Sequence, residues 1–153
     1  MKKIILLFLV LILAACASAP GRETGTELTR NQQKWQEANI SHYSFQLGVT
    51  CFCPVGGVMP MTVEVKDGEV VSLVDVNGEA FPATDPLNDL IEKYVTIDRI
   101  FSELNSDSVQ NAERLEVTYD PTYGFPSDVV IDFVEVVADD ELYLSVTGFE
   151  PLP

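Results

Sequence analysis

Residues 61–76 have the sequence MTVEVKDGEVVSLVDV, in which two apolar-rich runs flank the dipeptide Asp67-Gly68. Every second residue of the first run is apolar, which is the period of a strand with one buried face. An Asp-Gly pair between two such runs is a strong signal for a two-residue hairpin turn, because both turn positions need positive φ. The stretch therefore predicts two antiparallel strands, at about 61–66 and 69–76.

The same alternation predicts four further strands. In HYSFQLGVTCFC every second residue from Tyr43 to Val49 is apolar, and continuing the pattern places Cys51 and Cys53 on the same inward face. Three later runs alternate likewise, namely ERLEVTYD (113–120), SDVVIDFVEVV (127–137) and LYLSVTGFE (142–150). Segments rich in turn-forming residues separate them, PTYGFP at 121–126 and ADDE at 138–141.

Three segments have the period of a helix instead. Thr29 and Gln32 have the spacing of a capping box and predict a helix over 30–38 that turns Trp35 to the core. Asp85 as N-cap and Pro86 at the first helical position predict a second helix with an apolar stripe of Leu87, Leu90, Ile91 and Tyr94. Thr96 predicts the cap of a third, whose stripe consists of Ile97, Ile100, Phe101 and Leu104.

The predicted elements define an α+β fold. Their order is α-β-β-β-α-α-β-β-β, with hairpin links in both halves of the chain. This order predicts an antiparallel sheet of five to six strands with the helices packed on one face. Residues 28–153 are a suitable length for a single globular domain with its own core.

The N-terminus has the pattern of a lipoprotein signal. Lys2 and Lys3 precede ten uninterrupted apolar residues, a run too short to span a bilayer. The following Leu13-Ala14-Ala15-Cys16 resembles a bacterial lipobox, which implies removal of 1–15 and two or three acyl chains on Cys16. Residues 16–27 then serve as lipidated terminus and flexible tether.

The predicted location is therefore the bacterial cell envelope, with the membrane as a partner through the lipid on Cys16. Ala17, rather than an aspartate, follows that cysteine, which favours the periplasmic face of the outer membrane in a Gram-negative cell. The chain has a net charge of −15, and removing the two signal lysines, Lys2 and Lys3, makes it −17. Such a charge disfavours nucleic acid and anionic headgroups as partners.

The residue types needed for catalysis are scarce in this sequence. His42 is the only histidine, and no Gly-x-Ser-x-Gly or other nucleophile motif accompanies it. The run from Asp75 to Glu79 superficially resembles a calcium loop, but its glycine comes too early and the closing glutamate is missing, so we expect a polar turn. We accordingly expect no enzyme activity, no cofactor and no metal.

Cys51 and Cys53 are the only cysteines left once Cys16 carries lipid. An oxidising compartment and an even count favour a disulfide between them. In a regular strand their Cα atoms would lie roughly 6.6 Å apart, near the upper limit for a bridge, so the backbone has to bend at Phe52. Buried free thiols, a redox-active pair and half of a metal site remain alternatives.

Several of these motifs occur together in a fixed order. They are a tryptophan helix at Trp35, Tyr43-x-Phe45, Cys51-x-Cys53, the Val63–Gly68 hairpin, the helix motif of Thr96 to Phe101, and the turn from Tyr119 to Pro126. This order resembles a family of uncharacterised bacterial envelope proteins with a domain of unknown function, over about residues 35–149. The resemblance supports fold and location and implies no catalytic residues.

The segment after the cysteines is unusually apolar for a connection. Phe52, Val55, Val58, Met59 and Pro60 predict a binding loop. The sequence therefore predicts a non-enzymatic module that binds or supports another envelope protein or a glycan. The alternative is a thiol–disulfide active envelope protein that uses Cys51 and Cys53.

Overall fold

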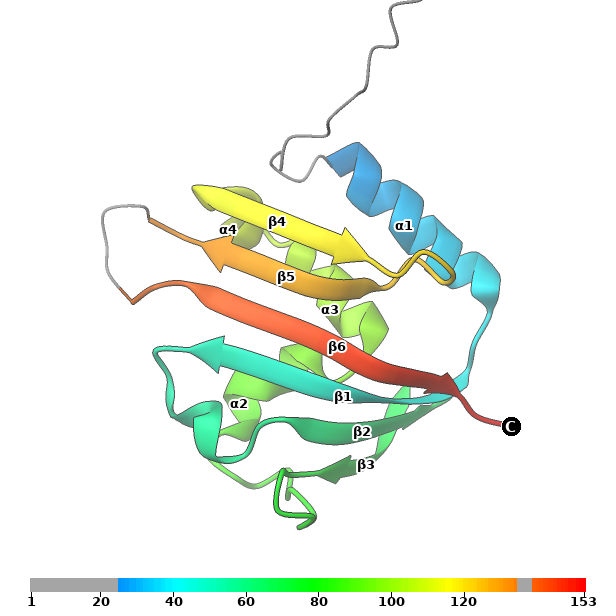
Figure 1. Cartoon of the computed structure of the whole chain (residues 1–153), viewed down its shortest axis with the longest axis vertical. Helices are drawn as coiled ribbons and strands as arrows, with labels where there is room; N and C mark the ends of the chain where they lie inside the picture. Colours follow the sequence, from blue (N-terminus) through cyan, green and yellow to red (C-terminus); the bar gives the residue numbers. More distant parts are fainter. Residues whose placement is uncertain (1–24, 135–138) are drawn as a thin grey trace, which may run out of the picture.

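The computed structural model describes residues 25–134 and 139–153 (Figure 1). Within this part of the chain, six strands form one antiparallel sheet in the order β3-β2-β1-β6-β5-β4. The strands are β1 (His42–Cys51), β2 (Met61–Lys66), β3 (Glu69–Val74), β4 (Arg114–Tyr119), β5 (Pro126–Asp132) and β6 (Leu142–Pro151). The predicted α+β class, antiparallel sheet and element order are confirmed.

The helices pack against one face of the sheet. They are α1 (Gly25–Ala38), α2 (Asn88–Ile91), α3 (Ile97–Leu104) and α4 (Asp107–Gln110), with 3₁₀ turns η1 (Pro54–Gly57) and η2 (Glu92–Tyr94). Figure 1 shows α2, α3 and α4 behind the sheet, while α1 lies beside the turn that follows β4. No helix of the described residues covers the opposite face of the sheet (Figure 1). Among the described residues, no helix is both long enough and apolar enough to cross a membrane.

The Asp-Gly hairpin forms as predicted. Asp67 and Gly68 have φ of 52° and 82°, and they join β2 to β3. β3 ends at Val74, two residues earlier than predicted, because Asp75 begins a tight turn. The Asp75 carboxylate accepts hydrogen bonds from the backbone amides of Asn77 (2.8 Å) and Glu79 (2.9 Å). These hydrogen bonds confirm the predicted polar turn. The hydrogen bond from the Glu79 amide is also the main reason why the pKa of Asp75 is lowered.

The three predicted helices differ in how closely they match. The third is confirmed: Thr96 Oγ1 accepts a hydrogen bond from the Arg99 amide (3.1 Å), and all four residues of its stripe are buried. The prediction of a capping box at Thr29 is wrong. The helix begins at Gly25, and the Thr29 hydroxyl donates to the Gly25 carbonyl oxygen (2.7 Å). The earlier start brings Leu28 onto the buried face, seven residues before Trp35.

The middle of the chain is less helical than predicted. The Asp85 side chain accepts a hydrogen bond from the Leu87 amide (2.8 Å), which forms a turn rather than the cap of a helix at Pro86. α2 therefore begins only at Asn88 and passes into η2 at Glu92. The sequence interpretation also missed α4, a single turn with its own Ser106 cap.

An aromatic cluster fastens α1 to the sheet. The Trp35 ring meets the rings of Tyr43, Phe125 and Phe149 edge-on, with centroids 5.3, 6.3 and 5.8 Å away. The indole nitrogen of Trp35 donates to Asp98 Oδ1 (3.3 Å), which ties α1 to the start of α3. The Tyr43 hydroxyl accepts a hydrogen bond from the Ile97 amide (3.2 Å), and burial raises the pKa of Tyr43 to about 12.

Two predicted regions lie wholly or partly outside the residues that the structure describes. β5 ends at Asp132, whereas the prediction continued to residue 137, and residues 135–138 are not described. Cys16, the predicted signal segment 1–15 and the tether up to residue 24 also lie outside the described residues.

Candidate functional site

Cys51 and Cys53 form a disulfide where β1 ends. The predicted bend at Phe52 is confirmed, because β1 stops at Cys51 and the chain turns out of the strand at Phe52. This bend brings the two Cα atoms to 5.1 Å, within the range that a bridge requires. The bridge holds Phe52 between two fixed positions, with 83% of its surface exposed.

The remaining loop residues do not all face solvent. Val55, in η1, is only 1% exposed, and Val58 and Met59 are half-buried against the core. The apolar character of this connection therefore serves the packing of the loop onto the domain. Pro60 is exposed, but Phe52 is the large apolar side chain that the loop presents to solvent.

The cysteine bridge should contribute little to stability. A closed loop of three residues gives about 1.6 kcal/mol in the chain-entropy treatment. We therefore expect the double variant Cys51→Ser/Cys53→Ser to remain folded and to lose no more than about that amount of unfolding free energy. Urea denaturation followed by circular dichroism measures this, and failure of the variant to fold would contradict it.

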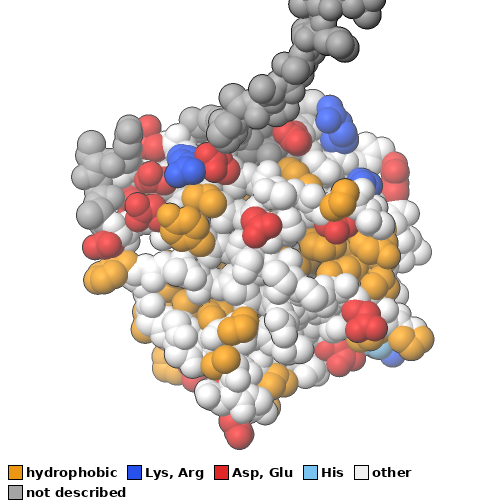
Figure 2. All heavy atoms as spheres, in the orientation of Figure 1, with side chains coloured by type: hydrophobic (Ala, Val, Ile, Leu, Met, Phe, Trp, Pro, Cys, Tyr) orange, Lys and Arg blue, Asp and Glu red, His pale blue; other side chains and the backbone are white. Residues whose placement is uncertain are grey.

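Phe52 adjoins Thr50 and Tyr143 at the sheet face that no described helix covers. Figure 2 shows that face in the orientation of Figure 1. Buried residues such as Val49, Val129 and Leu144 face the helices, so their neighbours in each strand point to the free side. Polar groups and backbone dominate this face in Figure 2, with small groups of hydrophobic side chains among them.

Two cross-strand rows form the part of this face nearest the disulfide. Thr50, Tyr143 and Val130 are neighbours across β1, β6 and β5, and Gly48, Ser145 and Asp128 form the adjacent row. Tyr143 is 48% exposed. The Ser145 hydroxyl lies over Gly48, where a Cβ would stand 2.4 Å from its oxygen, so the surface is shallow at that point.

These rows border two adjoining hollows. The first, of about 240 Å³, is named the Phe52–Tyr143 hollow here and is lined by Thr50, Cys51, Phe52, Asp139, Glu141 and Tyr143. The second, of about 150 Å³, shares Thr50 and Tyr143 with it and continues over Gly48, Asp128, Val130 and Ser145. Together they connect Phe52, the exposed aromatic residue of the loop, with Tyr143, an exposed aromatic residue near the start of the central strand β6.

Carboxylates surround these hollows. Asp139 and Glu141 line the first and Asp128 the second, and none of the three has an ion pair within the part of the chain that the structure describes. Asp128 accepts a hydrogen bond from the Ser127 hydroxyl (3.0 Å). On the neighbouring strand Arg114 pairs with Glu116 through two hydrogen bonds of 2.9 Å each, so that cation is already neutralised.

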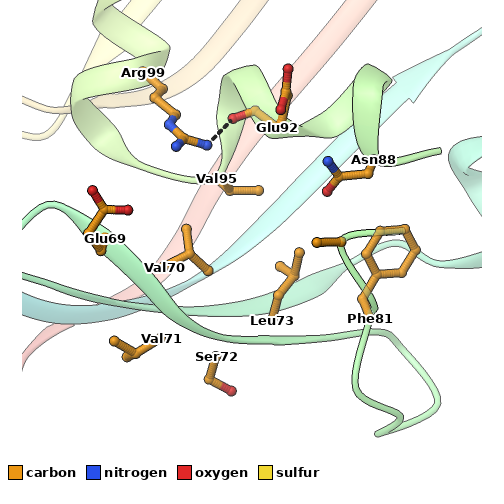
Figure 3. Close-up of a pocket in the computed structure, with 11 residues that line it drawn as sticks. Glu69, Val70, Val71, Ser72, Leu73, Phe81, Asn88, Glu92, Val95 and Arg99 are labelled. Carbon is orange, nitrogen blue, oxygen red and sulfur yellow. Dashed lines mark hydrogen bonds between the residues drawn. The ribbon is translucent and has the colours of Figure 1, made fainter. Parts of the chain in front are cut away.

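A separate hollow of about 400 Å³ lies between β3 and α2 (Figure 3). Val70, Leu73, Phe81 and Val95 turn apolar side chains into it, while the side chains of Val71 and Ser72 point away. At its edge the Arg99 guanidinium donates to the Glu92 carbonyl oxygen (3.0 Å).

The outer edge of β3 is only partly open to another strand. The segment 79–81 already pairs with the end of β3, since the Phe81 amide donates to the Leu73 carbonyl (2.8 Å). A register shift next to Val71 interrupts the rest of this edge, and such an irregularity discourages pairing with another chain.

His42 takes part in a local hydrogen-bond network at the other end of β1. Its Nε2 lies 2.9 Å from Glu64 Oε1, and its Nδ1 lies 2.8 Å from the Pro153 main-chain oxygen. Neither hydrogen bond involves a cysteine thiol or a serine or threonine hydroxyl. Among the described residues, no group of three or more histidine, cysteine or acidic residues has the arrangement to hold a metal ion.

The His42 network predicts a pH effect. The hydrogen bond with Glu64 is the main cause that raises the pKa of His42 above 6.5. This stabilisation is fully present below the unfolded value and is lost as the pH rises through the raised folded value. An NMR titration should place the pKa of His42 above 6.5, and Glu64→Gln should move it back toward 6.5. An unchanged value in Glu64→Gln would contradict this assignment.

The fold and the site define a small α+β domain with one sheet face that no described helix covers, and with no metal-binding group of side chains among its described residues. The chain belongs to the family of unknown function DUF6174, which it matches over residues 27–151. No curated protein matches it.

Proposed function

We propose that this chain is a lipid-anchored extracytoplasmic module that binds or supports another envelope component without catalysing a reaction. Phe52 is the observation that carries the proposal: a large aromatic side chain, 83% exposed, fixed by a disulfide next to the exposed Tyr143. Rigid aromatic side chains are typical of the residues that dominate the energy of protein interfaces. The proposed binding surface is the Phe52–Tyr143 hollow together with the adjoining part of the free sheet face.

The proposed anchor is the lipid on Cys16. The basic residues, the short apolar run and the Leu-Ala-Ala-Cys sequence support this assignment. We propose the bacterial envelope as the location, with the periplasmic face of the outer membrane in a Gram-negative cell. Two or more acyl chains give stable membrane attachment.

Cys16→Ser tests the anchor. We expect the variant to leave the membrane fraction for the soluble fraction, because the serine hydroxyl cannot carry the thioether-linked lipid. Fractionation of cells that produce either chain, followed by immunoblotting, measures the distribution. Membrane association equal to that of the wild type would refute lipidation at this residue.

Site-specific photo-crosslinking in intact cells tests the binding surface. A photoreactive p-benzoylphenylalanine placed at Phe52 should give a reproducible crosslinked product on illumination. The matched control is the same residue at Leu90, which is 42% exposed but lies on α2, on the other side of the sheet. Absence of any product from Phe52, or equal products from both positions, would contradict the proposed surface.

Thiol–disulfide exchange by Cys51 and Cys53 is a second candidate function. One observation favours it: Cys51 lines the Phe52–Tyr143 hollow, and both cysteines are only half-buried. A redox role requires a measurable population of reduced thiols in the cell. Trapping cellular thiols with an alkylating reagent measures it, and a pair that is fully oxidised and resists mild reductant would exclude this function.

A further inference from the structure

We propose that the Phe52–Tyr143 hollow receives a lysine or arginine side chain from the partner protein. This inference rests on the proposed function and gives the chemistry of its partner. It combines three observations: the exposed aromatic rings of the hollow, its carboxylates, which have no ion pair among the described residues, and the short side chains of the adjoining hollow.

The aromatic rings provide the first part of the recognition. Phe52 and Tyr143 line the same hollow and are both exposed, so a cation that enters it can meet the electron-rich face of a ring. The aliphatic stem of a lysine or arginine can pack on the same rings while its charged end stays in contact with water. The hollow, of about 240 Å³, has room for one long side chain.

The carboxylates give the charge of the occupant. Asp139 and Glu141 line the hollow, and Asp128 lies on the adjoining one. Arg114, a cation on the neighbouring strand β4, is joined to Glu116 by two hydrogen bonds and forms no ion pair with these carboxylates among the described residues. A second cation from a partner would complete the charge balance of this surface, since like charges at an interface are repelled and opposite charges are steered together.

The rest of the molecule adds to the same preference. The whole chain has a net charge of −15, so its long-range field attracts basic surfaces and repels acidic ones. Next to the hollow, Gly48 has no side chain and is covered only by the Ser145 hydroxyl, and Thr50 and Asp128 beside it also have short side chains. A partner segment can therefore approach the sheet closely with its basic residue inserted between the two aromatic residues.

A competition experiment on the full-length chain in its native membranes tests the inference. Membranes that carry the p-benzoylphenylalanine probe at Phe52 are illuminated with either N-acetylargininamide or N-acetylcitrullinamide, which is its uncharged counterpart. We expect the arginine compound to reduce the crosslinked product and the citrulline compound to leave it unchanged. Equal effects of the two compounds, or none from either, would overturn the inference. This comparison does not depend on the folding of a charge variant.

A charge variant gives the second measurement. We expect Asp139→Asn/Glu141→Gln to reduce the product about tenfold, the size expected when two partly exposed ion pairs are lost. The control Asp89→Asn/Glu37→Gln removes two exposed carboxylates from helices and should change nothing. A product from Phe52 that is insensitive to charge would refute the basic occupant and leave the proposed function standing. Absence of any product would refute the proposed function itself.

Discussion

Replacing Trp35 with alanine is expected to lower the free energy of unfolding by about 3–5 kcal/mol, the usual cost of removing a buried aromatic side chain. The Trp35 side chain is only 4% exposed, and its ring contacts those of Tyr43, Phe125 and Phe149. The variant also loses the hydrogen bond to Asp98. A loss of this size is a large fraction of the stability of a typical domain.

Urea denaturation measures the Trp35 effect, with circular dichroism as the signal because Trp35 is the only tryptophan in the chain. The control is Val71→Ala, at a position that is 54% exposed on the edge strand β3. Its effect should stay within about 0.5 kcal/mol. If Trp35→Ala cost less than about 1 kcal/mol, a value typical of an average substitution, α1 would not be fastened to the sheet in the way described.

Replacing Gly124 with alanine is expected to cost about 2–4 kcal/mol, from an unfavourable backbone angle and a steric clash. Gly124 has φ of +81°, in the turn where Asp120 accepts hydrogen bonds from the amides of Thr122 and Tyr123. An added Cβ would lie 2.7 Å from the carbonyl oxygen of Asn31, in α1. The helix backbone would have to move away from the turn, and Lys34, whose Nζ donates to the Pro121 carbonyl oxygen, would move with it.

Gly78→Ala is the matched control for this substitution. Gly78 has nearly the same backbone angle, φ of +84°, but an added Cβ would meet nothing within 4 Å. Its cost should therefore reflect the backbone angle alone, about 1–2 kcal/mol. Equal losses in the two variants would show that α1 does not press on Gly124, because the steric contribution would then be zero.

Local patterns predicted the elements whose determinants are adjacent in the chain. The hairpin at Asp67 and Gly68 needs only its two turn residues and the alternating strands beside them, and it forms as expected. The same holds for α3, whose cap and apolar stripe all lie between Thr96 and Leu104. The start of α1 was missed because burial of Leu28, a tertiary effect, outweighs the local capping signal at Thr29.

The candidate site was only partly predictable from the sequence. The spacing of Cys51 and Cys53 indicated a bend at Phe52, and that residue is the exposed aromatic of the site. Tyr143 was missed because it joins Phe52 only through the pairing of β1 with β6, which links positions about 90 residues apart in sequence. Val55 misled the interpretation, since the apolar residues of a loop can pack inward as well as face a partner.

The affinity of the crosslinked partner for two variants tests the central claim most directly. The partner captured through position 52 is titrated against Phe52→Ala and, as control, Leu90→Ala, both of which remove an exposed apolar side chain. We expect Phe52→Ala to weaken binding about 30-fold, corresponding to a loss of about 2 kcal/mol at an interface hot spot, and Leu90→Ala to bind like the wild type. Equal affinities for the two variants would contradict the claim that the aromatic side chain held by the disulfide is the centre of the binding surface.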